Sequence, residues 1–480
     1  MPCTSQFISC RKHQRLSHKM SEAERKPSPI LLQCTVGYTS VLLLQLKKMR
    51  LSTEQESWIA SMLAATMVLG ILLTAPTMRR GRKVALQVVS LLHITSWIVI
   101  SFAPNYEVLL VGRGIQGAAL GLFMSISGII IGEYTSPKHR GSFLATLSFG
   151  QAVGISSVHI CGSFVTWQHT ALLFSFLPLI SFIITIFLPE SPSWLALEER
   201  YEDCKNTFRR LRGCDEEEEL KKMIEARQLD TRTNGSAMKT LRSLRKREVY
   251  ISLILGALMY NIAIVSGATT LASFLNETIP VIISDNCYMP AWMVFCDGVR
   301  LISNGIGLFV VGRMRRRVML FSSGALCVIA YLAQAGYIYA KAAKIIQEVL
   351  WLPIVLLTLH ISTIGLGVML IPMMIIGEIY PLEHRSLCSA VTNCYLVVCM
   401  FAILKTFAGM KVSIGLEGAY LVYAVIVALA LVVSWFILPE TKGRTLQEIE
   451  EYFRRKPTAE PEDINELKPL KSPEQKEVAL

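Results

Sequence analysis

Acidic and basic residues at one repeated spacing are the residues of this sequence best placed to do chemistry. Glu133 is followed after six residues by Arg140, and Glu378 is followed after six residues by Arg385. The two elements lie 245 positions apart (378 minus 133) in a chain of 480 residues. An unpaired charge at the edge of an apolar segment is costly, so such residues are stable when they pair. The spacing therefore predicts ion pairs at helix ends, once in each half of the chain.

Two further repeats support a duplication of the whole chain. The basic loop at Arg79 has a counterpart at Arg313, an offset of 234, and Glu190 has a counterpart at Glu440, an offset of 250. We interpret the duplicated charges as a gate that holds an outward-open state and breaks on inward opening. The alternative is that they only fix topology. The predicted network comprises Arg82, Arg113, Glu133, Arg140, Glu190, Arg313, Glu378, Arg385 and Glu440.

Long apolar segments position these charges. Hydrophobic residues make up 52% of the chain, charged residues 18%, and the mean hydropathy is +0.45. Soluble domains carry about 25% charge and lack long apolar runs. Runs of about 20 apolar residues recur here, and each can cross the bilayer as a helix that satisfies its own backbone. We predict an all-α membrane protein of about twelve transmembrane helices in two six-helix halves.

The positive charges orient this fold. They concentrate in the loops after even-numbered spans and in the central polar segment, which is the pattern of cytoplasmic loops. Both termini are therefore expected to be cytoplasmic. The predicted division is an N-terminal tail (1–27), a six-helix bundle (28–188), a linker with short helices (189–247), a second six-helix bundle (248–439) and a C-terminal tail (440–480).

Composition also argues against several other classes of function. The net charge of +12 follows from the loops, so we expect no nucleic-acid partner. The twelve cysteines lie mostly in apolar spans and show no paired CxxC spacing, so we expect no metal site. The sequence shows no nucleophile–base pair and no phosphate-binding glycine loop. We therefore expect neither an enzyme nor a bound cofactor.

Five segments carry a family resemblance. They read GRGIQG (112–117), GEYTSPKHRG (132–141), PESPSWLA (189–196), GEIYPLEHRS (377–386) and PETKGRTLQEIE (439–450). They are similar to the signature segments of the sugar porter family of the major facilitator superfamily, over about 28–455. Within it the chain most resembles the insect facilitated trehalose transporters, for example in ESWIAS (56–61) and LKTFAG (404–409). The resemblance implies the major facilitator fold and alternating access, in which two six-helix bundles rock about a central site.

The residues that the resemblance assigns to substrate depart from the family pattern. The family's QQxSGxN motif reads AIVSGAT at 263–269, and its PxPW motif reads LIPM at 370–373, so two glutamines, an asparagine and a tryptophan are missing. Met78 and Gly312 replace acids that usually precede the basic loops. Small polar residues in the seventh span could take part in binding or only in helix packing. The candidate substrate contacts are Ser148, Gln151, Ser266, Thr269 and Asn393.

Asp297 and Arg300 are predicted to pair, because residues three apart share a helix face. The pair could be a substrate or proton-coupling site, since charge inside the membrane is often functional. Alternatively the two charges only neutralise each other. His159 and His360 are expected to be packed or hydrogen-bonded within the bundle. Asn276, in the sequon Asn-Glu-Thr, is a candidate glycosylation site.

The sequence thus predicts a monomeric plasma-membrane transporter in the lipid bilayer. Its substrate is expected to be a sugar, trehalose or hexose-like, moved by facilitated diffusion because the first span has no buried acid between Ser28 and Leu46. Two alternatives stay open. One is a proton-coupled carrier of a sugar or other small solute, and the other is a transport-deficient nutrient sensor.

Overall fold

The structure is a computed structural model. It describes residues 34–46, 51–135, 137–212, 217–218, 220–221, 223–224, 246–283, 288–346, 351–381, 384–442 and 446–454. Within these ranges only the backbone is described at 137–146, 385, 386, 446, 447, 450 and 454. The expected N-terminal tail, most of the expected C-terminal tail and the linker stretch between 224 and 246 therefore lie outside the described residues.

The N-terminal half consists of six long helices. They are α2 (Cys34–Leu46), α3 (Thr53–Arg79), α4 (Arg82–Ser101), α5 (Tyr106–Tyr134), α6 (Pro137–Phe164) and α7 (Trp167–Phe187). Two short helices follow, α8 (Pro192–Leu197) and α9 (Tyr201–Arg212). Local capping sets some of these starts: Ser52 accepts from Gln55 N ahead of α3, and Asn105 accepts from Val108 N ahead of α5.

The C-terminal half repeats the pattern with two interrupted helices. Its elements are α12 (Arg247–Ala263), η3 (Ile264–Ala268), α13 (Thr269–Ile282), α14 (Met289–Val311), α15 (Arg316–Ala342), α16 (Trp351–Thr363), η4 (Ile364–Val368), α17 (Leu370–Ile379), α18 (Arg385–Ile437) and α19 (Leu446–Arg454). The π-helical segments η3 and η4 interrupt two spans. Gly267, in η3, has φ +96°, which is a conformation that favours glycine.

The described helices account for twelve spans. Nine described segments are long and apolar enough to cross a membrane, and one of them, Leu387–Ile437, is two helices joined at Gly415 (φ +74°). Counting that segment as two and adding α2 and α6 gives twelve. The described residues contain no strand. The prediction of an all-α membrane protein with about twelve helices is confirmed.

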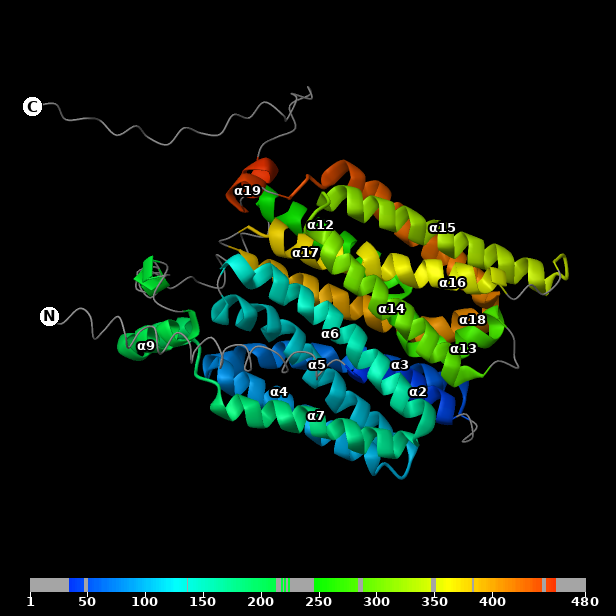
Figure 1. The fold of residues 1–480 in the computed structure, drawn as a ribbon, viewed down its shortest axis with the longest axis horizontal. Helices are drawn as coiled ribbons and strands as arrows, with labels where there is room; N and C mark the ends of the chain where they lie inside the picture. The colour runs from blue at the N-terminus through cyan, green and yellow to red at the C-terminus, as the bar shows by residue number, and fades with distance from the viewer. Residues whose placement is uncertain are drawn as a thin grey trace, which may run out of the picture.

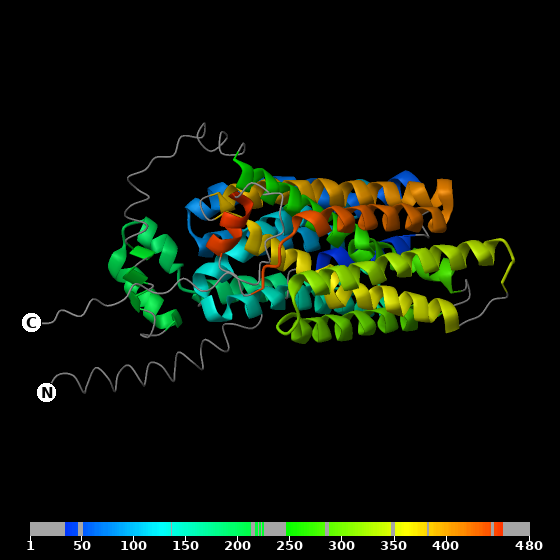
Figure 2. The same ribbon diagram turned by 90° about the horizontal axis from the view of Figure 1, so that it is seen from above.

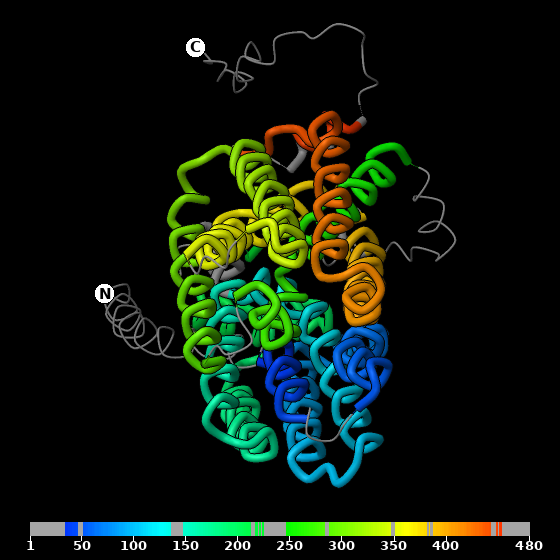
Figure 3. Tube along the Cα trace, turned by 90° about the vertical axis from the view of Figure 1, so that its right-hand side faces the viewer, coloured from blue at the N-terminus to red at the C-terminus, as the bar shows by residue number. Residues whose placement is uncertain are grey.

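The long helices run side by side in two groups. Figure 1 shows α2–α7 below and α12–α18 above, and Figure 3, seen along the helices, shows the same two groups. The end at which α9 and α19 lie is called the linker end, and the opposite end is called the far end. Figure 2 shows the green helices that follow α7 beyond the ends of the long helices.

Glycines allow the close packing within the first half. A Cβ added at Gly117 would lie 2.1 Å from Leu63 O, and one at Gly121 would lie 2.1 Å from Met67 O. Both contacts are far shorter than atoms tolerate, so α3 and α5 can approach this closely only because these positions lack side chains. The close packing holds the acid at the end of α5 in a fixed position relative to the loop after α3.

Three helix pairs join the two halves. They are α3 with α18, α6 with α14, and α2 with α13. Near the far end, Asn276 Nδ2 donates to Ser40 O at 2.8 Å, and Lys405 Nζ donates to Ser57 Oγ at 2.9 Å. Lys405 also lies over the Trp58 ring, 3.9 Å from its centroid. These contacts close the far end between the halves.

Candidate functional site

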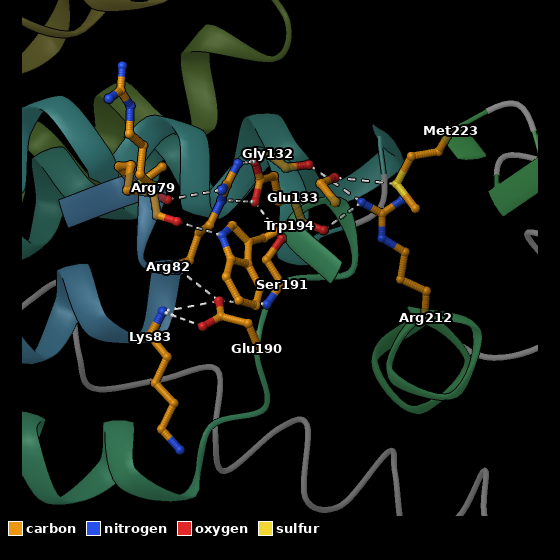
Figure 4. Close-up of polar contacts among 12 residues, drawn as sticks. Arg79, Arg82, Lys83, Gly132, Glu133, Glu190, Ser191, Trp194, Arg212 and Met223 are labelled. Carbon is orange, nitrogen blue, oxygen red and sulfur yellow. Dashed lines mark hydrogen bonds and ion pairs between the residues drawn. The ribbon is translucent and has the colours of Figure 1, made fainter. Parts of the chain in front are cut away.

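The first charge cluster is built at the linker end of the N-terminal half (Figure 4). Arg82, at the start of α4, donates from Nε and Nη2 to the two oxygens of Glu133 at 2.8 and 2.7 Å. Both side chains are about nine-tenths buried. A bidentate pair of this kind is stronger than a single ion contact, because two charge-assisted hydrogen bonds fix one geometry. The cluster therefore ties the end of α5 to the start of α4.

Glu190 caps the N-terminus of α4, the helix that begins at Arg82. Its carboxylate accepts from Arg82 N at 2.8 Å and Lys83 N at 3.2 Å. A negative charge there satisfies free amide groups and favours the positive end of the helix dipole. Ser191 Oγ donates to Glu133, which closes the cluster. Gly81, with φ +122°, lets the chain turn beneath Glu190.

The second half repeats this arrangement. Glu440 accepts from Arg316 N at 3.0 Å and Arg317 N at 3.2 Å, capping α15 as Glu190 caps α4. Arg316 faces Glu378 at 3.6 Å, a longer and less buried pair than the one in the first half. Corresponding side chains also bind corresponding carbonyls: Lys83 Nζ to Ile186 O at 2.6 Å, and Arg317 Nη2 to Trp435 O at 2.9 Å.

Two members of the predicted network are wrong. The Arg313 side chain is exposed, and its backbone carbonyl accepts a hydrogen bond from Lys442 Nζ at 2.7 Å. The counterpart of Arg82 is Arg316, and the offset of 234 already pointed to it. Arg113 is buried in the bundle, where it donates to Thr39 Oγ1 and Gln116 Oε1. It lies twenty residues before Glu133 on one helix, roughly 30 Å away along the axis.

The side chains of Arg140 and Arg385 lie outside the described residues, so their predicted pairing stays a prediction. The linker adds a group that the sequence analysis did not include. Arg212 Nη2, at the end of α9, donates to Glu133 O at 3.0 Å. The short helices expected in the linker include α9, which packs on α8 through Phe208, Leu195 and Cys204. Burial raises the pKa of the Cys204 thiol to about 11.

A small cavity lies between the halves, on the linker side of the far-end contacts. Ser148 and Gln151 of α6 line one wall, and Arg300 and Asn304 of α14 line the opposite wall. Apolar residues of α13, α16 and η4 complete it. Its volume is about 40 Å³, room for a few waters, whereas ligand pockets measure roughly 300–1,000 Å³. A sugar can enter only after the halves move.

The predicted substrate contacts divide into two sets. Ser148 and Gln151 line the cavity. Ser266, Thr269 and Asn393 are not among the residues that line it. Ser266 Oγ donates to Ala263 O at 2.8 Å, and Asn393 Oδ1 accepts from Tyr260 at 2.8 Å within the C-terminal half. Asn304 was missed, although it follows Arg300 by four residues and so shares its helix face.

The predicted pair of Asp297 and Arg300 forms, and it has a third member. Arg300 Nη1 donates to Asp297 Oδ1 at 2.6 Å. The other carboxylate oxygen, Oδ2, lies 2.7 Å from Nδ1 of His159, which belongs to the opposite half. His360 is buried in the C-terminal half and bonds Ser266 O at 2.9 Å. Both histidines are therefore hydrogen-bonded within the bundle, as predicted.

The position of Asn276 does not fit a glycan. It lies inside α13 and is 1% exposed, with its amide nitrogen donating to Ser40 O and Oγ. A sugar chain on this nitrogen has no room between the halves. In the described part of the chain, no group of three His, Cys, Asp or Glu residues stands close enough to hold a metal ion.

Comparisons with known proteins agree with this architecture. A family model described as "Sugar (and other) transporter" matches residues 3–453. A facilitated trehalose transporter of Apis mellifera ligustica is 26% identical over 464 residues, covering 92% of this chain and 89% of the relative. A facilitated trehalose transporter of Bombyx mori is 26% identical over 421 residues, covering 86% and 82%.

Solved structures show the same fold. The inward-open xylose transporter XylE of E. coli superposes with a TM-score of 0.72 at 14% identity, covering 91% of this chain and 99% of that one. XylE bound to 6-bromo-6-deoxy-D-glucose gives a TM-score of 0.70 at 17% identity, covering 89% and 98%. The chain therefore has the major facilitator fold.

Proposed function

This chain belongs to the sugar (and other) transporter family, and on that premise we propose that it carries trehalose or a hexose-like sugar by facilitated diffusion across the plasma membrane. It is a multi-pass membrane transporter and not an enzyme. The observation that carries the proposal is the cavity lined by both halves, directly behind the contacts that close the far end. Such a site between two rocking bundles is the geometry of alternating access.

We propose that the linker end is cytoplasmic and the far end faces outside. Supporting this, Arg79, Arg82 and Lys83 lie at the linker end of the first half, and Arg313 and Arg316 occupy the matching loop of the second. Positive residues of short loops favour the cytoplasmic side. The proposed division stays a six-helix bundle at 28–188, a linker at 189–247 and a bundle at 248–439. We further propose that one chain suffices for transport.

On this orientation the described conformation is closed to the outside. Both charge clusters are formed in it, although the sequence analysis expected them to break on inward opening. The reason is local: the described contacts of Arg82, Glu133 and Glu190 lie within one half and its linker. We therefore propose that the clusters stiffen each half as a rigid body. The element that can move relative to this rigid body is α9, which contacts the first cluster through Arg212.

The proposed sugar site is the cavity wall formed by Ser148, Gln151, Arg300 and Asn304. Amide and hydroxyl groups can donate to and accept from sugar hydroxyls, and the surrounding apolar residues can cover the ring. This set is smaller than the family pattern, so the structure favours a site that uses α6 and α14 more than the seventh span.

Uptake of radiolabelled trehalose and glucose in oocytes tests the proposal. We expect saturable uptake of at least one sugar, and a three- to tenfold rise in KM for Gln151→Ala and Asn304→Ala. That rise corresponds to the loss of about one hydrogen bond worth 0.5–1.5 kcal/mol. Ser266→Ala is the control, because that side chain bonds only inside its own half.

Three outcomes would change the proposal. No uptake of either sugar despite normal surface expression would overturn the sugar transporter proposal. Sugar binding without flux would identify a sensor instead. Equal KM changes in Gln151→Ala and Ser266→Ala would show that the cavity is not the binding site.

A further inference from the structure

His159 links the two halves through both of its ring nitrogens. It lies on α6 and is fully buried (0% exposed). Nδ1 lies 2.7 Å from Asp297 Oδ2 on α14, and Nε2 lies 3.1 Å from the Gly37 carbonyl oxygen on α2. Rotating the ring by 180° would present carbon atoms to both oxygens and lose both hydrogen bonds, so the ring has one favourable orientation.

These two contacts fix how many protons the pair contains. The Gly37 carbonyl can only accept, so Nε2 must carry a proton. A neutral imidazole carries one proton, which leaves Nδ1 bare against a carboxylate, and two acceptors cannot bond each other. Either His159 is doubly protonated, or Asp297 is protonated and donates to Nδ1. In both cases the pair holds one proton more than a neutral histidine and a separate carboxylate.

The charge of Arg300 keeps Asp297 paired whether the far end is open or closed. Arg300, on the same helix, donates to its other oxygen at 2.6 Å and would move with it. The titratable groups in the middle of the packed elements include Cys161 on α6, Cys296 on α14, Cys34 and Tyr38 on α2, and Arg113 on α5, whereas Tyr106, Glu107, Glu133 and Tyr134 lie at the ends of α5. Tyr38 donates to Trp167 O, and Arg113 is bonded to Thr39 and Gln116. Asp297 is therefore the one carboxylate that His159 is shown to bond.

The pair also lies beside the proposed site. Ile155, one helical turn before His159, lines the cavity, and so does Arg300. Along α6 and α14, His159 and Asp297 lie nearer the far end than the lining residues Ile155 and Arg300, so the pair is on the far-end side of the cavity. Any opening of the far end that parts α6 from α14 must break the His159–Asp297 bond.

We propose that the His159–Asp297 pair is a proton-binding latch of the far end. It binds one proton when the halves are closed there, and releases that proton to the outside water when they part. The step is balanced: the N–H or O–H bond of the pair breaks, and water accepts the proton. This proposal rests on two parts of the proposed function: that the far end opens and closes, and that it faces the outside. It does not depend on which solute is carried.

The number of protons that the pair binds in each state sets the direction and the size of the pH effect. The closed state binds more protons than the open state, so acid favours the closed state. A histidine in water loses its proton near pH 6.5. Well above that pH, opening releases one full proton, and the ratio of open to closed protein falls about tenfold for each unit of acidification. Below about pH 6 the separated histidine stays protonated and the dependence fades.

A cysteine reporter measures this ratio without any sugar. Ser40→Cys places a thiol that is buried between the halves when the far end is closed. The rate at which this thiol is labelled by a membrane-impermeant maleimide is divided by the rate for Glu107→Cys, an exposed position at the far end of α5. This division corrects for the change of thiol ionisation with pH. Labelling of the chain without either reporter gives the background. The same reporters are placed in His159→Gln, Asp297→Asn and His360→Gln chains.

We expect the corrected rate to fall about fivefold from pH 7.5 to pH 6.5 in the wild-type background, because half of the separated histidines keep their proton at pH 6.5. His360→Gln should keep this slope, because His360 bonds only within one half. His159→Gln and Asp297→Asn should change less than twofold over the same range. Asn at 297 can donate an amide proton to Nδ1, which keeps the hydrogen bond and removes the need for the extra proton.

A flat profile in the wild-type background, or an unchanged slope in both His159→Gln and Asp297→Asn, would overturn the proposal. Normal Glu107→Cys labelling in each variant shows that the protein has folded and reached the surface. Because no sugar is present, failure to transport trehalose or glucose would leave this result untouched.

Discussion

Replacing Glu133 by Gln should destabilise the protein far more than the equivalent replacement of Glu378. Arg82 keeps its charge but loses a bidentate partner at 2.7 and 2.8 Å, with both side chains about nine-tenths buried. Leaving a buried charge without its partner costs about 3–5 kcal/mol. Partial exposure places this pair at the lower end, about 3 kcal/mol.

The duplicated pair provides the matched control. Arg316 and Glu378 stand 3.6 Å apart, and their side chains are 14% and 27% exposed. Such a contact is worth about 1 kcal/mol or less. With roughly 2 °C of melting temperature per kcal/mol, Glu133→Gln should lower Tm by about 6 °C and Glu378→Gln by about 2 °C.

Thermal stability of the detergent-solubilised protein, followed by fluorescence size-exclusion chromatography, measures both shifts. The double variant Arg82→Gln/Glu133→Gln should recover part of the loss, because it removes the uncompensated charge. Two results would refute this reasoning: equal Tm shifts for Glu133→Gln and Glu378→Gln, or strictly additive effects in the double variant. Either would show that the distance and burial of an ion pair do not set its contribution to stability here.

Three further predictions concern individual positions. Gly81→Ala should lower the free energy of unfolding by about 1–3 kcal/mol, because φ is +122° and the new Cβ would lie 2.4 Å from Glu190 Oε2; a Tm shift below 1 °C would contradict this. Gly117→Ala should abolish surface expression or reduce it severely, because its Cβ would lie 2.1 Å from a backbone oxygen of α3, whereas Gly128→Ala, with nothing within 4 Å, should express normally. Equal expression of the two would contradict the close packing. Cys204, with its pKa raised to about 11, should hold about one thiolate in a thousand at pH 8 and label slowly with maleimide until α9 detaches from α8; fast labelling of the intact protein would contradict the burial.

The repeated charges were predictable because they follow sequence spacing. Glu133, Glu190, Glu378 and Glu440 were found through similar offsets of 245 and 250, and each contacts the first residue of α4 or α15. The offset of 234 also contained Arg316, but the loop at Arg313 holds several arginines. Which of them turns inward depends on where α15 begins, and that start is fixed by its contact with Glu440.

The residues that line the cavity were harder to predict, because helix phase decides which side chains face it. The π-helical segment η3 uses one more residue per turn than an α-helix, so it rotates the residues on either side of it relative to each other. Ser266 and Thr269 lie in and just after that segment. Counting residues along the sequence does not reveal this rotation. The prediction of Ser266 and Thr269 relied on resemblance to an unbroken motif and therefore did not take it into account.

Sequence by itself determined the membrane class, the duplication into two halves and the charge clusters at helix ends, because apolar length and repeated spacing are local properties of the chain. Only the tertiary structure decided that Asn276 is buried between the halves, that the Arg113 side chain bonds Thr39 of α2, and that His159 reaches Asp297. His159 and Asp297 are 138 residues apart, and their meeting depends on how two bundles pack. Contacts between halves arise from the rotation and depth of whole helices, which no local pattern fixes.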